Sequence, residues 1–180
     1  MTKKKIMVHT QQLTVAEIRA YFNKHTKKTK HPGIFKVTKP MKVWKKTKDT
    51  SYFQGDVIVA LEIPVGALVH AHMFGYGCAS DNTMNRALSY RKMRTSRAKV
   101  VEQFQLGKVG GTGIYKLKPG NYQFSIKYYN SISESISGWS SSFKYTTGKI
   151  VKPKNKFSMD NDQCASGVHF FINLSDAMKW

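Results

Sequence analysis

Histidine and cysteine side chains gather near the middle of the chain, at His70, His72 and Cys78. Imidazole nitrogen and thiolate sulfur are the ligands that Zn²⁺ prefers in proteins, and Cys164 and His169 could act as distant further ligands. The C-x2-C and H-x3-H pairs of compact zinc sites are missing from the sequence. We therefore expect histidines at a strand end and a buried thiol rather than a metal centre, and we predict no cofactor.

The other reactive side chains do not form a pattern that catalysis requires. Cys164 and His169 lie five residues apart in an expected strand, where alternation would direct them to opposite faces. Asp160 and Asp162 are close together but lie beside lysines, which favours a solvated turn over an acid and base pair. The glycine run around Lys108 lacks the G-K-[ST] ending of a phosphate-binding loop. We predict that the protein is not an enzyme.

Positive charge is the strongest signal in the sequence. The chain holds 30 Lys and Arg against 10 Asp and Glu, a net charge of +20. The first 50 residues contain 14 Lys and Arg and two acids, so that twelve of the net charges lie there. Self-repulsion at such a charge opposes compaction, and an anionic partner would relieve it. Nucleic acid, an anionic membrane surface and acidic faces of neighbouring subunits are all candidates.

Two basic segments are predicted to contact a polyanion. The first flanks Phe22, Phe35 and Trp44, and lysines beside exposed aromatic rings would suit phosphate contact together with base stacking. Alternatively, these aromatic residues belong to the core and the lysines only maintain solubility. The second segment is rich in arginine, which binds phosphate or carboxylate with two hydrogen bonds and could equally hold acidic protein surfaces. The predicted polyanion-binding residues are Lys24, Lys27, Lys28, Lys30, Lys42, Lys45, Lys46, Lys48, Arg86, Arg91, Lys92, Arg94 and Arg97.

Length and composition favour one ordered domain. The chain has 180 residues, of which 41% are apolar and 12% aromatic, values typical of globular proteins. We expect an α+β fold: a single compact domain, mostly antiparallel sheet, with a short N-terminal helix and a short C-terminal helix. Residues 1–48 would form a basic N-terminal region with one helix. Residues 49–180 would form the α+β domain, with an inserted Gly/Ser-rich hairpin region at about 107–142.

The sequence predicts a protein that is not secreted. Polar residues follow the first seven, MTKKKIM, where a signal peptide would continue with apolar residues. No apolar run approaches the roughly 20 residues that a transmembrane helix needs. In a reducing cytosol the two cysteines, Cys78 and Cys164, would remain free thiols.

One helix start is clearly marked. Thr14 and Glu17 have the spacing of a capping box, and Leu13 and Ile18 suit the hydrophobic staple across it. We expect a helix over residues 15–22, ended by the lysine-rich run that follows. Residues 24–31 would then form an exposed loop.

Extended structure is expected from residue 34 onward. Residues 34–37 and 41–44 combine apolar and basic residues and predict strands with one solvated face. The run DVIVALEI at residues 56–63 predicts a central strand buried on both faces. Residues 73–85 indicate a long loop, residues 83–92 a short helix and residues 107–113 a flexible connection. Further strands are predicted at residues 67–71, 98–104, 122–129, 143–146 and 167–172, a surface hairpin or loop at 131–142, and a terminal helix capped by Ser175.

Three segments together resemble a known domain. These are residues 57–69 (VIVALEIPVGALV), 91–101 (RKMRTSRAKVV) and 164–178 (CASGVHFFINLSDAM). In this order they resemble an uncharacterised domain of large DNA viruses and phages that often accompanies pentapeptide-repeat proteins. Its members carry L-E-I-P-x-G-A, then K-x-R-x-S-x-A-x-V, then C-x-S-G-[IV]-H-F-F. The resemblance implies a viral or phage origin and a compact α+β domain, with Cys164, Gly167 and His169 as signature positions.

Charge, the lack of a catalytic pattern and the resemblance lead to one expected function. We expect a non-enzymatic structural or assembly protein of a large DNA virus, a minor capsid or virion component that binds acidic subunit surfaces, membrane headgroups or genome. The alternative is a DNA-binding or RNA-binding protein that acts through its basic patches. The expected location is the virion or the interior of the host cell.

Overall fold

The fold is built around β5 (Asp56–Ile63), which pairs with β4 (Met41–Asp49) on one side and β8 (Ala98–Leu106) on the other. On one face of β5, Val57, Val59, Leu61 and Ile63 enter the main core, whereas Ile58 and Ala60 enter a second cluster on the opposite face. The predicted central strand, buried on both faces, is therefore confirmed.

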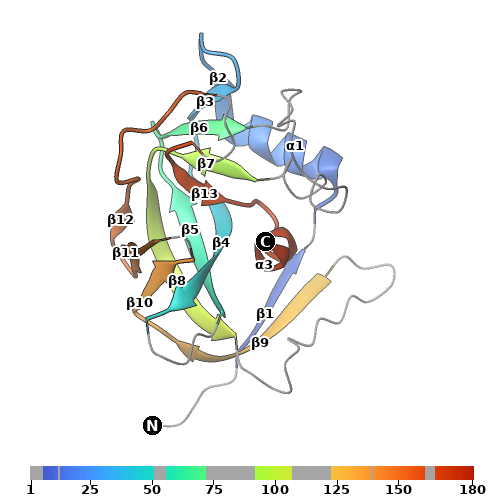
Figure 1. The fold of residues 1–180 in the computed structure, drawn as a ribbon. Coiled ribbons are helices and arrows are strands. Elements are labelled where there is room, and N and C mark those ends of the chain that lie inside the picture. Colours follow the sequence, from blue (N-terminus) through green and yellow to red (C-terminus); the bar gives the residue numbers. More distant parts are fainter. Residues whose placement is uncertain are drawn as a thin grey trace, which may run out of the picture.

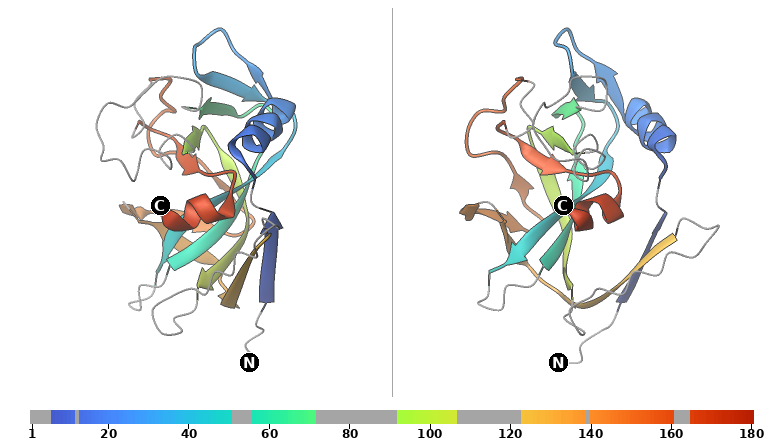
Figure 2. Two further views of the ribbon diagram at one scale, coloured as in Figure 1. Left: turned by 90° about the vertical axis from the view of Figure 1, so that its right-hand side faces the viewer. Right: turned by 45° about the vertical axis from the view of Figure 1, so that its right-hand side comes forward.

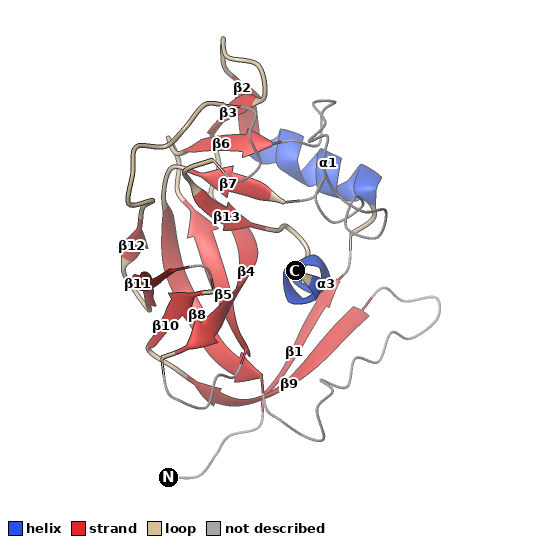
Figure 3. Ribbon diagram, in the orientation of Figure 1, coloured by secondary structure: helices blue, strands red, loops and turns tan. Residues whose placement is uncertain are grey.

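The computed structural model describes residues 6–11, 13–50, 56–71, 92–106, 123–138, 140–160 and 165–180. These form two antiparallel sheets and two short helices in one compact domain, as expected (Figures 1 and 3). The larger sheet has eight strands in the order β1 (Ile6–Gln11), β9 (Gln123–Ser131), β8, β5, β4, β10 (Glu134–Ser137) and β11 (Ser140–Thr146), with β12 (Ile150–Val151) also paired to β8. The smaller sheet has five strands in the order β13 (Val168–Phe170), β7 (Met93–Thr95), β6 (Leu68–Ala71), β3 (Ile34–Val37) and β2 (Thr26–Lys28).

The two sheets and the helices enclose two apolar cores. In Figure 1 the smaller sheet crosses one end of the larger sheet, with α1 (Val15–His25) beside it, and Figure 2 shows β1 and β9 side by side at the other end. The main core contains Ile18 and Phe22 of α1. The rings of Phe22 and Phe35 pack edge to face, with their centres 4.9 Å apart. The second core lies where α3 (Leu174–Lys179) packs on the larger sheet, and it includes Trp44 and Phe104.

The capping box at the start of α1 forms as predicted. Thr14 Oγ1 accepts a hydrogen bond from Glu17 N at 3.3 Å, and Thr14 N donates to Glu17 Oε2 at 2.8 Å. The hydrogen bonds from Thr14 lower the pKa of the Glu17 carboxyl. The predicted helix end was three residues too early, since the helix continues to His25. The expected loop after it was also wrong, because residues 26–28 pair with β3 as strand β2.

The terminal helix is confirmed, but its predicted cap is wrong. The N-cap position is Asn173 rather than Ser175, and the Asn173 side chain makes no capping hydrogen bond. Instead, Asn173 Oδ1 accepts from Leu13 N at 3.0 Å and Asn173 Nδ2 donates to Leu13 O at 2.9 Å. Ser175 is buried, and its hydroxyl makes no hydrogen bond within the part of the chain that the structure describes.

Most of the other predicted strands are present with small shifts of their ends. Strands β3, β4, β6, β8, β9, β11 and β13 fall where extended structure was expected, and the serine-rich stretch forms the β10–β11 hairpin. Each of the two sheets contains strands from the part of the chain before residue 49 and strands from the part after it. The loop predicted at residues 73–85, the helix predicted at 83–92 (up to residue 91) and the connection predicted at 107–113 lie outside the described residues.

Candidate anion-binding sites

Exposed lysines gather at one end of the molecule, around the β2–β3 hairpin and the C-terminal end of α1. The loop that joins β2 and β3 lies at the top of Figure 1. Lys39 belongs to the same end, since its backbone N–H donates to His25 O at 3.3 Å. We call this surface the basic tip. It comprises the exposed lysines Lys24, Lys27, Lys28, Lys30, Lys36 and Lys39.

The basic tip places like charges directly opposite one another. Lys27 and Lys36 are register partners in the antiparallel pair of β2 and β3, and both side chains are exposed. Like charges in this position destabilise a sheet, by roughly 0.2–1 kcal/mol. Within the described part of the chain, no lysine of the basic tip forms an ion pair. This surface therefore carries uncompensated positive charge.

The four predicted lysines of β4 divide between different environments. Lys42 is exposed, with its Nζ 5.0 Å from the centre of the Trp44 ring, and Lys48 forms an exposed ion pair with Asp56 at 2.6 Å. Lys46 Nζ donates to Met178 O of α3 at 3.1 Å. Lys45 lies on the other face of the strand and lines a cleft. These lysines therefore do not act together with the basic tip as one surface.

The aromatic residues beside the first basic segment are not available for base stacking. Phe22 is 0% exposed, Phe35 5% and Trp44 6%, because each fills one of the two apolar cores. The interpretation that these rings belong to the core is the correct one. Phosphate or carboxylate contact by the lysines themselves is unaffected by this result.

The second basic segment is largely internal where the structure describes it. Arg86 and Arg91 lie outside the described residues. Lys92 is 6% exposed, and its Nζ lies 4.3 Å from the centre of the Trp180 ring. Arg97 is half-buried and donates to Val65 O at 3.3 Å. Arg94 is fully buried.

Arg94 serves the interior of the protein. Its guanidinium donates to the backbone carbonyls of Ser158 and Asp160, and more weakly to Ser166 O at 3.4 Å. The ring of Phe157 packs over the guanidinium, with the ring centre 5.3 Å from Arg94 Cζ. These hydrogen bonds hold in place the loop that precedes β13. In this fold Arg94 cannot reach a polyanion at the surface, because its charged group is enclosed by the chain.

The predicted metal ligands are not brought together by the residues that the structure describes. His70 is buried in β6, whereas His72, Cys78 and Cys164 lie outside the described residues. His169 is half-buried in β13 and lines the same cleft as Lys45. Over the described ranges, no group of three or more His, Cys, Asp or Glu side chains is placed to hold a metal ion.

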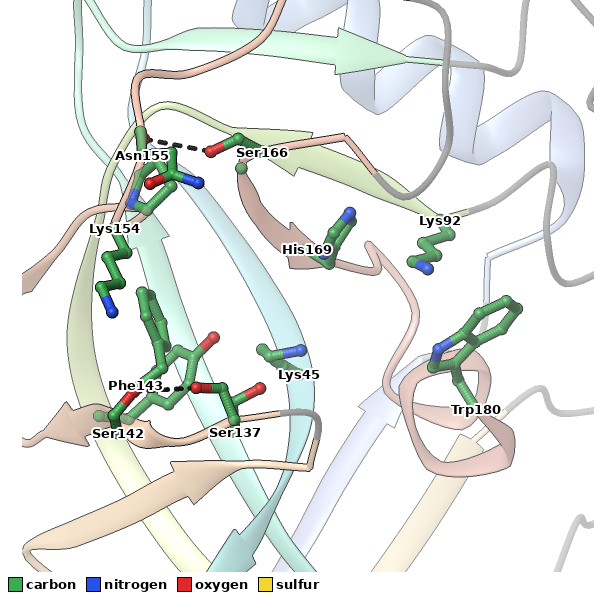
Figure 4. A pocket seen from close by; sticks show the side chains of 14 residues that line it. Lys45, Lys92, Ser137, Ser142, Phe143, Lys154, Asn155, Ser166, His169 and Trp180 are labelled. Carbon is green, nitrogen blue, oxygen red and sulfur yellow. Dashed lines mark hydrogen bonds between the residues drawn. The ribbon is translucent and has the colours of Figure 1, made fainter.

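A cleft of about 850 Å³ lies between β4, the β10–β11 hairpin and β13. Figure 4 shows its side chains arriving from these strands, from the loop after β12 and from the C-terminal residue Trp180. Three amines line it, those of Lys45, Lys92 and Lys154, together with the His169 imidazole. Of the described residues that line the cleft, none is acidic. The charged side chains that line the cleft are therefore all cationic.

The Lys45 amine is strongly affected by its surroundings in the cleft. It lies 6.0 Å from the centre of the Tyr145 ring and forms no ion pair or hydrogen bond with any part of the chain that the structure describes. Burial, and secondarily the positive charge of Lys92, lower the pKa of Lys45 to about 8. Burial raises the pKa of Tyr145, so its hydroxyl stays neutral. An anion in the cleft would find at Lys45 a cation that has no anionic partner among the described residues.

Sequence reasoning placed Lys45 and Lys92 in different segments and missed the cleft that joins them. It also missed Lys154 and the serine hydroxyls, since these lie in loops and strands more than 40 residues away along the chain from both. The sequence does offer one signal. Lys45 follows Met41 and Val43 at intervals of two, so a strand places its amine on the core face.

One comparison with known families gives a match. The model of a family of unknown function (DUF5758) matches residues 122–177. This agrees with the expectation of an uncharacterised domain, and the matched range includes the cleft residues Tyr145, Lys154 and His169. No curated protein and no solved structure matches the chain. Among the described residues, no helix has the length and apolar character to cross a membrane.

Proposed function

We propose that the protein is a non-enzymatic attachment protein, a structural or assembly component of the particle of a large DNA virus, which holds an acidic partner through the basic tip. The observation that carries this proposal is the set of exposed lysines that form no ion pair with any described residue, with Lys27 and Lys36 directly opposed. An acidic partner would convert the repulsion within this surface into attraction across an interface.

A simpler explanation accounts for only part of the basic tip. Lysines on the edge strand of a sheet prevent unwanted pairing with other chains, and β2 is an edge strand. That explanation covers Lys27 and Lys28. It does not cover Lys36, which belongs to the interior strand β3, or Lys24 and Lys39, which lie outside the sheet. A binding surface explains all of these lysines.

The partner we favour is the acidic surface of another virion subunit. Base stacking beside the basic tip is not available, because the neighbouring aromatic rings are in the core. The tip consists of lysines, which act as point charges and give little geometric selection of individual phosphates. Membrane headgroups and genome remain testable as other anionic partners.

The experiment compares two variants of equal charge. In the tip variant, Lys24, Lys27, Lys28 and Lys36 are each replaced by Gln. In the control variant, the exposed lysines Lys99, Lys149, Lys152 and Lys179 are replaced by Gln. Binding to polyglutamate, to a 20-base-pair DNA duplex and to phosphatidylserine vesicles is measured as a function of salt concentration.

We expect the tip variant to bind polyglutamate at least tenfold more weakly than the control variant, which should resemble wild type. Equal binding by both variants would refute the proposal. If duplex DNA binds more tightly than polyglutamate, with a log-log salt slope near −5 that the tip variant reduces, the protein is a nucleic-acid binder instead. The particle assignment fails if quantitative proteomics of purified virions does not detect the chain at stoichiometric levels.

A further inference from the structure

The cleft at Lys45 is separate from the basic tip and has a different chemistry. Three amines from different parts of the chain, those of Lys45, Lys92 and Lys154, line one space with no acidic side chain among its described lining residues (Figure 4). The positive charge of Lys92 acts on the Lys45 amine, and a single carboxylate would offset only one positive charge. A phosphate monoester carries about −1.5 to −2 charges near pH 7, which suits the cleft better.

Hydrogen-bond donors also line the cleft. The hydroxyls of Ser137, Ser140, Ser142 and Ser166 line it together with the side chain of Asn155. The Ser140 and Ser142 hydroxyls lie 3.0 Å apart, and Ser166 Oγ donates to Asn155 O at 3.1 Å. A phosphate group presents three strong acceptor oxygens, so it can use several of these donors at once.

Aromatic and apolar side chains form the remaining wall. The rings of Phe143 and Tyr145 in β11 pack edge to face, with their centres 5.3 Å apart. Trp180 lies at the other side of the cleft, beside Lys92. These rings suit a flat apolar group better than an extended peptide chain. The volume of about 850 Å³ also falls within the range of about 300–1,000 Å³ typical of sites for small molecules.

The position of Lys45 shows that the cleft is costly for the protein when it holds no anion. Lys45 comes from the core face of β4, between Val43 and Thr47, two side chains that are almost fully buried. A methionine would fill this place without desolvating a charge. A lysine at this position is therefore better explained by an anion that it binds than by folding.

We propose that the cleft between β4, β11 and β13 binds a small organic phosphate: Lys45 and Lys92 hold the phosphate group, and Tyr145, Phe143 and Trp180 contact a flat apolar body. This site is independent of the partner of the basic tip. The ligand is defined by two features, a dianionic phosphate and an attached ring, and the test must require both.

The test uses phenyl phosphate and adenosine monophosphate as probes, with benzoate, adenosine and inorganic phosphate for comparison. Affinities are measured by calorimetry and by the fluorescence of Trp180, whose signal is assigned with a Trp180→Phe variant. We expect each organic phosphate to bind at least tenfold more tightly than its counterpart without phosphate and than inorganic phosphate. Binding should weaken as the pH rises above about 8, where Lys45 loses its proton. The groups that face Lys45 in the cleft are Lys92, Lys154, His169 and Tyr145.

Three variants decide the interpretation. Lys45→Met should lower the affinity for phenyl phosphate at least tenfold, while replacing the exposed Lys42 on the opposite face of the same strand by Met should leave it unchanged. The tip variant should also leave it unchanged, which separates this site from the proposed attachment function. Three results would overturn the assignment: no organic phosphate binds with a dissociation constant below about 1 mM, binding survives Lys45→Met, or polyglutamate displaces phenyl phosphate from the tip variant.

Discussion

Gly167 lies directly against the side chain of Arg94. A methyl group at position 167 would stand 2.8 Å from Arg94 Cβ and 3.2 Å from Arg94 Cγ and Cδ, so only glycine allows this approach. The contact joins two of the sequence patterns, since Arg94 belongs to K-x-R-x-S and Gly167 to C-x-S-G. The same guanidinium holds the loop before β13 through the Ser158 and Asp160 carbonyls. Arg94 and Gly167 therefore have a structural role.

Substitution of Gly167 by Ala is predicted to destabilise the protein. The added methyl group would push Arg94 away from its carbonyl partners, and overpacking of this kind costs about 1–3 kcal/mol. Urea unfolding followed by circular dichroism gives the free energy of unfolding. The matched control is Gly138→Ala in the β10–β11 turn, where a methyl group would meet no atom within 4 Å. If both substitutions have the same small effect, the proposed contact is not important for stability.

The local patterns of the sequence predicted the fold well where neighbouring residues determine the structure. The β5 strand was evident because it is a nearly continuous run of apolar and β-branched residues. The start of α1 was evident because Thr14 and Glu17 form a capping box with each other. The stretch after α1 was mispredicted as a loop. Its lysines favour solvent, but the backbone of residues 26–28 is held by pairing with β3, which a local pattern does not reveal.

Asn173 is predicted to be more important for stability than its place at a helix start suggests. Replacing it with Ala removes both hydrogen bonds to Leu13, across 160 positions of the chain, and leaves a partly buried N–H and carbonyl without these partners. We expect the free energy of unfolding to fall by about 2 kcal/mol. The exposed Asn23 of α1 provides the comparison. Asn23→Ala should change stability little, and a similarly small effect of Asn173→Ala would contradict the prediction.

The candidate site was less predictable than the fold, for a physical reason. A polyanion surface was predicted from the number of lysines, but number alone does not distinguish an exposed amine such as Lys36 from a confined one such as Lys45. The cleft depends on the pairing of β4 with β10, which brings residue 45 near residue 137. Contacts over such distances in sequence are set by the whole sheet.

Gln103 is predicted to hold the strand that carries the cleft residue Tyr145 in place, although Gln103 itself does not line the cleft. It is 1% exposed, and its Nε2 donates to Tyr145 O at 2.9 Å and to Ser133 O at 3.1 Å, so that it ties β8 to the β10–β11 hairpin. Gln103→Met keeps the volume but removes these donors, and we expect a loss of about 1–3 kcal/mol in the free energy of unfolding. Phenyl phosphate should also bind more weakly, because Tyr145 would shift. Gln105→Met on the same strand, which loses one contact with Asp49, should cost less.

Lys45→Met is predicted to stabilise the protein in the absence of ligand, while it weakens the binding of organic phosphates at least tenfold. The charged amine is confined without an anion, and its removal should raise the free energy of unfolding by roughly 1 kcal/mol at pH 7. This value is modest because Lys45 stays partly exposed and solvent screens its charge. Thermal and urea unfolding of both proteins measure the difference. An exposed substitution, Lys36→Met, serves as the control for the loss of one charge.

The difference in the free energy of unfolding between Lys45→Met and the wild type should depend on pH in a defined direction. The pKa of Lys45 in the folded protein is about 8, below its ordinary value of 10.5, so folding is penalised fully below pH 8. Between pH 8 and pH 10.5 the folded protein releases the proton while the unfolded chain keeps it, and the stability of the wild type rises relative to Lys45→Met. We therefore expect the advantage of Lys45→Met to shrink between pH 7 and pH 9.5. An advantage that stays constant over this range would show that the Lys45 amine is not confined as the cleft geometry requires.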